Sequence, residues 1–310
     1  MASFPPPPSR AVWLGWPLAL ASTTCFSVAV TISKYAIGLW LNPTAMLVVR
    51  FVITIVLLGS TLTLAGAGRA RIDRRALLVC VAGGLANGIG QLAFFWALPR
   101  MHASIASMLF SVNPLAVLAL LSLRGERFTY RNLIRVGLGL AGVYLLIGPG
   151  GQADWLGVLL VAISVWGSSI HLVLLQWFLQ GYDSRAVTFY VTATMMSVIV
   201  GYWLVQGRPW HDPGWQGWAA VVALAVVSTY LARLSMVTAI KHLGSGQIAL
   251  LTPVETLLTV IWSMLFLGER LSPIQWFGGV LVLSSALLAV RRLSRVRARV
   301  AAENAAGRHL

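Results

Sequence analysis

Long apolar stretches separated by short polar breaks dominate this sequence. An α-helix needs about 20 residues to cross the hydrocarbon of a bilayer, and ten windows of roughly that length are present. They cover residues 14–36, 43–65, 75–98, 103–123, 131–149, 155–178, 185–206, 216–239, 245–267 and 273–291. The runs are continuous and far longer than the strands of a membrane barrel. The pattern therefore predicts an all-α integral membrane protein with ten transmembrane helices.

The composition supports the same fold class. Charged residues make up 10% of the 310 residues and hydrophobic residues 58%, whereas a soluble domain carries roughly 25% charged residues. Disorder requires low hydrophobicity and is excluded as well. The net charge of +15 lies in short loops and the C-terminal tail, which is typical of a polytopic protein and not of a nucleic-acid groove. Cys25 and Cys80 lie in apolar stretches and are expected to pack as small hydrophobic residues.

The lysines and arginines predict an orientation. With a cytoplasmic N-terminus, seventeen of them fall on the inner side and four on the outer side, while Arg50 and Arg233 lie within helices. Positive loops face the cytoplasm. We therefore expect a multi-pass protein of the cell (inner or plasma) membrane with both termini in the cytoplasm.

The chain also repeats itself. Residues 13–15 (Trp-Leu-Gly) recur at 155–157, an offset of 142, and residues 125–127 (Gly-Glu-Arg) recur at 268–270, an offset of 143. Each half holds five helices, an odd number, so the halves should insert with opposite orientation. Inverted repeats are common in secondary transporters, which bind substrate between the halves near the bilayer midplane. The expected segments are a cytoplasmic N-terminal segment (1–12), two repeats (13–149 and 150–292) and a basic cytoplasmic tail (293–310).

A doubled motif carries a resemblance to a known family. The pattern Leu/Phe-x-Gly-Glu-Arg-hydrophobe-Thr/Ser occurs at 123–129 and 266–272, with Pro114 and Pro253 upstream and Arg50-Phe51 early in the second helix. Together these features resemble the drug/metabolite transporter superfamily, and specifically its EamA-type members with two five-helix repeats. The resemblance covers nearly the whole chain and implies a transporter, but it says little about the substrate. Glu255 has no counterpart in the family pattern.

The Gly-Glu-Arg triplets are expected to be structural. Glu126 and Glu269 each lie just before a new helix, and a carboxylate is favoured near the positive end of a helix. Pro114 and Pro253 lie inside predicted spans, where a proline kinks or breaks a helix. The break could line the binding cavity and bend during transport, or it could be a static kink. Small residues such as Gly84 are expected to allow close helix packing.

Four ionisable residues are predicted inside spans, where charge is costly and is usually paired or functional. We expect a structural role for Arg50 and a packing role for His171. Arg233 and Glu255 lie about 10 Å and 15 Å deep at about 1.5 Å per residue, which would allow them to pair. Glu255 is the one carboxylate in any span. It is expected to line the cavity, with a purely structural ion pair as the alternative.

Uncharged polar and aromatic residues complete the predicted cavity, because amides need partners inside a membrane. Whether they hold substrate or only join helices stays open at this point. The candidate cavity residues are Asn87, Gln91, Phe95, Trp166, Ser169, Tyr230, Arg233, Glu255 and Trp262, and the candidate helix breaks are Pro114 and Pro253.

The sequence therefore predicts a secondary transporter that exports amino acids or related small metabolites by alternating access. Export or facilitated passage of drugs or other organic solutes is the alternative. A channel or a membrane enzyme is a further possibility that no catalytic constellation favours, and no metal or cofactor is expected. The expected partners are a small-molecule solute, protons as a coupling ion and membrane lipid, without nucleic acid.

Overall fold

The computed structural model describes residues 9–39, 42–64, 72–122, 130–147, 154–178, 182–210, 212, 214–243, 251–285 and 287–288. Helices and short turns account for these residues, and no strand occurs among them. The all-α class predicted from the apolar pattern is therefore confirmed for the described part of the chain.

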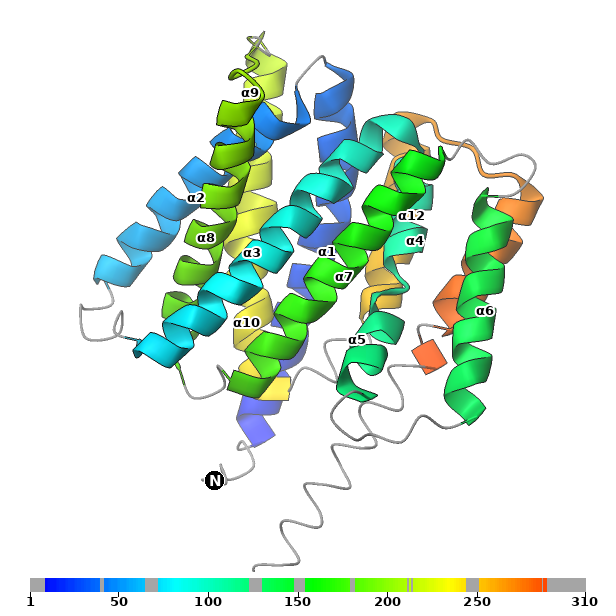
Figure 1. Cartoon of the computed structure of the whole chain (residues 1–310), viewed down its shortest axis with the longest axis horizontal. Coiled ribbons are helices and arrows are strands. Elements are labelled where there is room, and N and C mark those ends of the chain that lie inside the picture. The colour runs from blue at the N-terminus through cyan, green and yellow to red at the C-terminus, as the bar shows by residue number, and fades with distance from the viewer. Residues whose placement is uncertain are drawn as a thin grey trace, which may run out of the picture.

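The helices follow one another with short connections. In chain order they are α1 (Ser9–Gly38), α2 (Pro43–Leu64), α3 (Arg74–Ala97), η2 (Leu98–Arg100), α4 (Ala103–Phe110), α5 (Asn113–Ser122), α6 (Tyr130–Ile147), α7 (Trp155–Phe178), α8 (Ser184–Val205), α9 (Gly214–Ala223), η3 (Leu224–Leu231), α10 (Ala232–Leu243) and α12 (Thr252–Leu267). Residues 273–285 form a further helix. Figure 1 shows these helices side by side, with the start of α1 at the same end as the start of α3.

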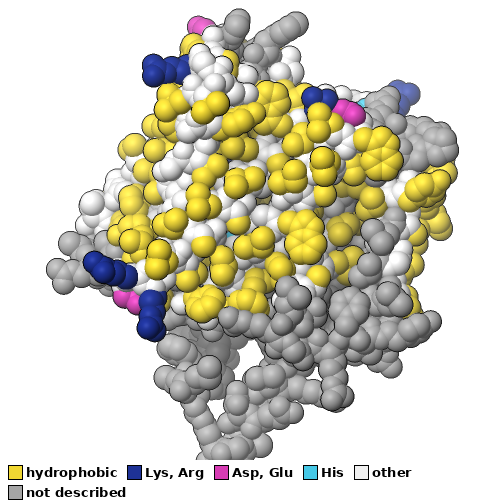
Figure 2. All heavy atoms as spheres, viewed as in Figure 1, with side chains coloured by type: hydrophobic (Ala, Val, Ile, Leu, Met, Phe, Trp, Pro, Cys, Tyr) yellow, Lys and Arg dark blue, Asp and Glu magenta, His cyan; other side chains and the backbone are white. Residues whose placement is uncertain are grey.

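Helix length and surface chemistry both suit a bilayer. Six helical segments are long and apolar enough to cross a membrane: Gly15–Gly38, Pro43–Leu64, Arg74–Arg100, Trp155–Leu175, Arg185–Val205 and Gly214–Met236. On the face drawn in Figure 2, hydrophobic side chains cover the middle, while the Lys, Arg, Asp and Glu side chains lie toward the two ends. Hydrocarbon can solvate that apolar middle, whereas water could not do so without a large cost.

Two of the predicted spans are not regular α-helices. The helix predicted over 103–123 is interrupted by a turn at Ser111 and Val112, directly before Pro114. Pro253 likewise lies in the first turn of α12, where its missing N–H costs nothing. In the span predicted over 216–239, residues Leu224–Leu231 form a π-helix. Nothing in the periodicity of the sequence predicts that π-helix.

Helix α3 lies at the centre of the packing, against α7 on one side and α8 on another. Small residues permit the close approach, as the sequence predicts. A Cβ atom on Gly167 would come within 2.3 Å of the Ala86 carbonyl oxygen, and one on Gly84 within 2.6 Å of Thr194 Cβ. At the right edge of the bundle in Figure 1, α6 packs on the helix over 273–285. A Cβ atom on Gly142 of α6 would lie 2.7 Å from a backbone oxygen of that helix.

Candidate solute-binding site

Arg50 is buried in the first half of α2, and its side chain reaches the π-helix. Its Nε donates a hydrogen bond to Thr229 Oγ1 at 2.5 Å, and its Nη2 donates to Ser228 Oγ at 2.9 Å. The guanidinium carbon also lies 5.6 Å from the centre of the Phe95 ring on α3. The structural role expected for Arg50 is thus confirmed, because this side chain joins α2, α3 and η3.

The π-helix explains why the two hydroxyls can receive Arg50. Ser228 Oγ donates to the Leu224 carbonyl oxygen at 2.6 Å, and Thr229 Oγ1 donates to the same oxygen at 3.2 Å. Each hydroxyl has one proton and two lone pairs. Because both protons are directed to Leu224, the lone pairs are left to accept from Arg50. A π-helix of this kind is frequent at functional sites.

Arg233 follows the π-helix on α10, and its surroundings differ from the sequence prediction. It lies one helical turn after Thr229, which accepts a hydrogen bond from Arg50. Glu255 is not within ion-pair distance of it, since Arg100–Asp154 is the one ion pair formed between described residues. The predicted depths are compatible with an Arg233–Glu255 pair, but depth alone does not bring α10 and α12 together, and the structure does not form the pair.

Four polar side chains inside the spans make no hydrogen bond in the part of the chain that the structure describes. They come from both halves of the chain and are half-buried: Gln91 on α3, Tyr230 on η3, Arg233 on α10 and Glu255 on α12. Most buried polar groups in proteins have a partner, and a membrane supplies none outside the protein. These four groups are the core of the candidate site.

The remaining candidates lie in different surroundings. Asn87 and Trp262 are half-buried, and each bonds to a neighbouring helix. Asn87 Nδ2 donates to Met195 Sδ at 3.5 Å, and Trp262 Nε1 donates to Ser27 Oγ at 3.2 Å. Ser169 is fully buried, and its hydroxyl donates to the Val165 carbonyl at 2.7 Å. It also lies 3.3 Å from Asn113 Oδ1 at the start of α5. Ser169 therefore joins two helices.

Trp166 differs from the other candidates because it points outward. Its side chain is 48% exposed, and it belongs to the exposed stripe of α7 with Leu159, Ile163 and Ile170. The opposite face of α7, with Gly167, packs on α3. Trp166 is therefore not part of the candidate site.

Glu269 forms the most extensive polar contact at one end of the bundle. Its buried carboxylate accepts hydrogen bonds from the backbone N–H of Ala103 at 2.7 Å and of Ser104 at 3.0 Å, and from Ser104 Oγ at 2.5 Å. These groups form the N-terminus of α4. Gly268 has a φ of 65° and ends α12, which turns the chain so that the carboxylate can reach α4. The structural role predicted for Glu269 is confirmed, although it caps α4 and not the helix that follows it. Glu126 lies outside the described residues.

Lys34 adds a second contact at the same end. Its Nζ donates to the carbonyl oxygens of Leu98, the first residue of η2, and of Met101, which directly follows η2. A cavity of about 490 Å³ lies beside it, lined by Lys34, His102, Leu267, Gly268, Glu269 and Arg270. Two of the side chains that line this cavity, Lys34 and Glu269, already hold backbone groups of η2 and α4 and so join helices at this end of the bundle.

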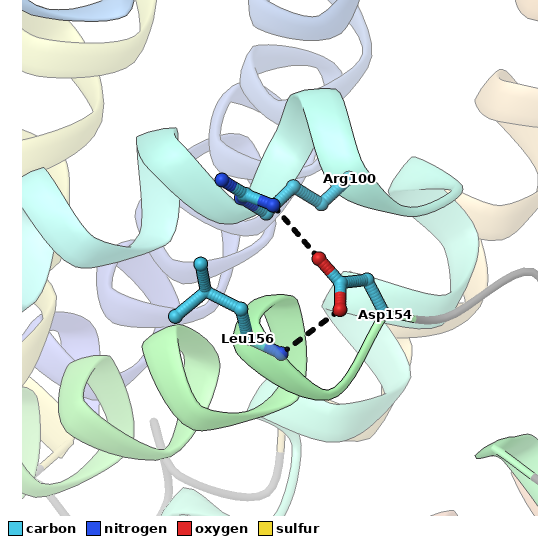
Figure 3. A network of polar contacts seen from close by, with 3 residues as sticks. All are labelled: Arg100, Asp154 and Leu156. Atoms are coloured by element: carbon cyan, nitrogen blue, oxygen red, sulfur yellow. Dashed lines mark hydrogen bonds and ion pairs between the residues drawn. The ribbon is translucent and has the colours of Figure 1, made fainter.

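Two exposed aspartates join helix ends outside the spans. Arg100 Nη1 lies 2.8 Å from Asp154 Oδ2 (Figure 3), while Asp154 Oδ1 accepts from the Leu156 N–H at the start of α7. The hydrogen bond from the Leu156 N–H lowers the pKa of Asp154 most, and the hydrogen bond from Arg100 lowers it further. At the opposite end, Tyr182 Oη donates to Asp73 Oδ1 at 2.5 Å. That hydrogen bond lowers the pKa of Asp73 and raises the pKa of Tyr182.

Comparison with known proteins gives the family. The model of the EamA-like transporter family matches residues 13–148 and again residues 155–291. The chain belongs to the EamA-like transporter family. An uncharacterized transporter of Archaeoglobus fulgidus is 25% identical over 205 residues, which cover 66% of this chain and 73% of that protein. The uncharacterized transporter YcbK of Bacillus subtilis is 24% identical over 271 residues, which cover 84% of this chain and 87% of that protein.

The EamA membership makes this chain a multi-pass membrane transporter, as the doubled Gly-Glu-Arg motif predicts. The crystal structure of another protein has the same fold. Its TM-score is 0.63 at 21% sequence identity, and the match covers 93% of this chain and 99% of the other. Among the described residues of this EamA chain, no three His, Cys, Asp or Glu side chains come together as a metal site would require.

Proposed function

We propose that this transporter exports amino acids or related small metabolites by alternating access, through a cavity between two inverted five-helix repeats. The observation that carries the proposal is the set of polar groups inside the spans that have no partner among the described residues. Gln91 belongs to the first half, whereas Tyr230, Arg233 and Glu255 belong to the second. Polar groups from two halves that find no partner in the described part of the protein are suited to bind water and a solute, as in the sites of inverted-repeat transporters.

The packing of the helices supports the two-repeat arrangement. If the halves are related by the offset of about 142 residues, α1 corresponds to α7, α2 to α8, and α3 to α9–α10. Exchanging the halves then turns the α3–α7 contact into the α10–α1 contact, and the α5–α7 contact into the α12–α1 contact. All four contacts are present. The two separate family matches, one to each half, support the same arrangement.

The irregular helices supply places where the bundle can bend. The break before Pro114 lies between α4 and α5, and the π-helix at 224–231 lies between α9 and α10. Interrupted helices in transporters expose backbone groups where they line a cavity, and Pro253 begins α12 at the corresponding place in the second half. Alternating access would tilt the segments on either side of these interruptions.

The charges support the proposed orientation. Arg74, Arg75 and Arg185 lie at the starts of α3 and α8, the end of the bundle where α1 begins in Figure 1. By the excess of lysine and arginine on that side, this end faces the cytoplasm. Glu269 and Lys34 then close the outer end. Protons are the proposed coupling ion, because Glu255 is a titratable carboxylate inside a span with no partner among the described residues.

A cysteine substituted for Gln91 tests the cavity directly. In a variant with Cys25→Ser and Cys80→Ala, Gln91→Cys should react with membrane-impermeant thiol reagents from both sides of oriented vesicles, at different rates. Leu159→Cys, on the lipid-facing stripe of α7, should stay unlabelled from both sides and is the matched control. A Gln91→Cys thiol that reacts from neither side would contradict the cavity, and one that reacts equally at both sides without any change of state would indicate a channel.

A further inference from the structure

Arg50 keeps its full positive charge in spite of its three contacts. Its partners are the hydroxyls of Ser228 and Thr229 and the ring of Phe95, and all three are neutral. They fix the position of the guanidinium without neutralising it. Arginine has five N–H donors, and the two hydroxyls take one from Nε and one from Nη2. Nη1 makes no hydrogen bond within the described part of the chain and remains available to a ligand.

Arg233 brings a second positive charge to the same place. It follows Thr229, a hydrogen-bond partner of Arg50, by one helical turn, and its guanidinium has no hydrogen bond to the described residues. Two guanidinium groups inside a membrane repel each other more strongly than they would in water. Glu255, the carboxylate of the described spans, forms no ion pair with either. Among the described residues, the two arginines therefore have no anion as a partner.

The fold itself does not require these charges. At the offset of 142 residues, Thr192 on α8 corresponds to Arg50, and Gln91 on α3 corresponds to Arg233. Both counterparts are neutral. Thr192 is fully buried, and its hydroxyl has no partner among the described residues. Because each arginine has a neutral residue at the corresponding position of the other half, the two cations need a reason beyond the packing that the halves share.

We propose that Arg50 and Arg233 together bind one carboxylate of the transported solute, with Arg50 held fixed by the π-helix and Arg233 able to move with α10. This inference rests on the proposed cavity and names the chemical group that the cavity selects. Guanidinium matches the planar, two-oxygen geometry of a carboxylate. Gln91 lies one turn before Phe95 on α3, so an amide donor faces the same region. The solute is thus a monoanion or a zwitterion whose acidic end lies between the two halves.

The test measures the charge preference of a thiol placed beside the pair. In the Cys25→Ser, Cys80→Ala background, Gln91→Cys is reacted with sulfonatoethyl and with trimethylammonioethyl methanethiosulfonate. The labelling rate of each reagent is divided by the rate at which the same reagent reacts with a small thiol in solution, which corrects for the intrinsic reactivity of the two reagents. We expect the anionic reagent to be favoured by about fivefold or more, as a nearby uncompensated charge requires. The preference should fall toward unity in Arg233→Gln and stay unchanged in Arg185→Gln, an exposed control.

A matched pair of probes identifies the bound group. Benzoate at millimolar concentration should slow the labelling of the Gln91→Cys thiol and lose that effect in Arg233→Gln, whereas benzamide should not slow it. Chloride at the same concentration should have little effect. Labelling without charge preference, equal protection by benzamide, or equal protection by chloride would each overturn the carboxylate site while leaving the cavity intact. A Gln91→Cys thiol that never reacts would overturn the cavity, and with it this inference.

Discussion

Ser104 and Glu269 lie 165 positions apart in the sequence, and their side chains are joined by a hydrogen bond of 2.5 Å. The same carboxylate accepts from two backbone N–H groups of α4. A loop of the second half thus holds a helix of the first half at its positive end.

Removing that carboxylate should destabilise the protein. Glu269→Ala leaves two buried N–H groups of α4 without an acceptor, and loss of a helix cap costs about 0.5–2 kcal/mol, more when charge-assisted bonds are lost. We expect a melting temperature several degrees lower in detergent, with a smaller loss for Glu269→Gln. Asp212→Asn is the matched control, because Asp212 is exposed and accepts from Gly214 N–H in a surface loop. An unchanged melting temperature in Glu269→Ala would contradict the capping role.

The Asp73–Tyr182 contact should make stability depend on pH at both extremes. The hydroxyl of Tyr182 lowers the pKa of Asp73 below its usual 3.8, so this stabilisation is present above 3.8 and is lost as pH falls through the lower folded-state value. The pKa of Tyr182 is raised above 10.0, so its stabilisation is present below 10.0 and is lost as pH rises through the folded-state value.

Tyr182→Phe therefore gives a specific profile. The melting temperature of the variant should lie below that of the wild type by a constant, small amount between about pH 5 and pH 9. The difference should shrink below and above that range. Asp183→Asn, a change at the neighbouring cap of α8, should not reproduce the alkaline part of the profile. A difference that stays independent of pH in both strong acid and strong alkali would contradict the hydrogen bond.

Close packing of α3 on α7 should make one glycine irreplaceable. A Cβ on Gly167 would lie 2.3 Å from the Ala86 carbonyl oxygen and 3.2 Å from Gly90 Cα, both backbone atoms that cannot move aside. Gly167→Ala should therefore cost about 1–3 kcal/mol or more and lower the yield of folded protein. Gly201 on α8 has open space around its Cβ position. Gly201→Ala should be neutral or stabilising by about 0.5–1 kcal/mol, and the reverse order would contradict the packing.

Proton coupling is expected to depend on Glu255. Glu255→Gln should abolish the response of transport to a pH gradient in proteoliposomes but preserve solute exchange, because exchange needs no net proton movement. Thr259→Ala removes a hydroxyl on the same helix that, among the described residues, donates to the backbone carbonyls of Glu255 and Ser27, and it should keep the gradient response. Full gradient-driven transport in Glu255→Gln would show that the proton moves elsewhere or that transport is uncoupled.

The sequence predicts the helical class and the break before Pro114 because length, hydrophobicity and a missing N–H act locally. It does not predict the π-helix at 224–231, since one extra residue per turn leaves the span equally apolar. Trp166 shows a second limit. Lipid is as apolar as a protein core, so an aromatic residue in a span suits either the lipid face or a cavity, and its position in sequence does not distinguish them.

Side-chain partners across the bundle are the least predictable part of the candidate site. Depth along a helix suggests a pairing of Arg233 with Glu255, whereas the structure forms no such pair and places Arg233 one helical turn after Thr229, a partner of Arg50. The adjacent hydroxyls of Ser228 and Thr229, placed inside an apolar span, are the one available signal of a partner for Arg50. That signal indicates the type of partner, a hydrogen-bonding side chain, but not the helix that supplies it, because this depends on how α2 packs on η3.

Solute counterflow tests the central claim most directly. Proteoliposomes are loaded with an unlabelled mixture of amino acids, and the entry of labelled amino acids present outside at low concentration is followed without any ion gradient. The account predicts that the trapped solute accelerates entry and that labelled solute transiently exceeds its outside concentration, and that Arg233→Gln loses this effect while Arg185→Gln keeps it. Entry that is equally fast with and without trapped solute, for every amino acid tested, would contradict alternating access to an amino-acid site.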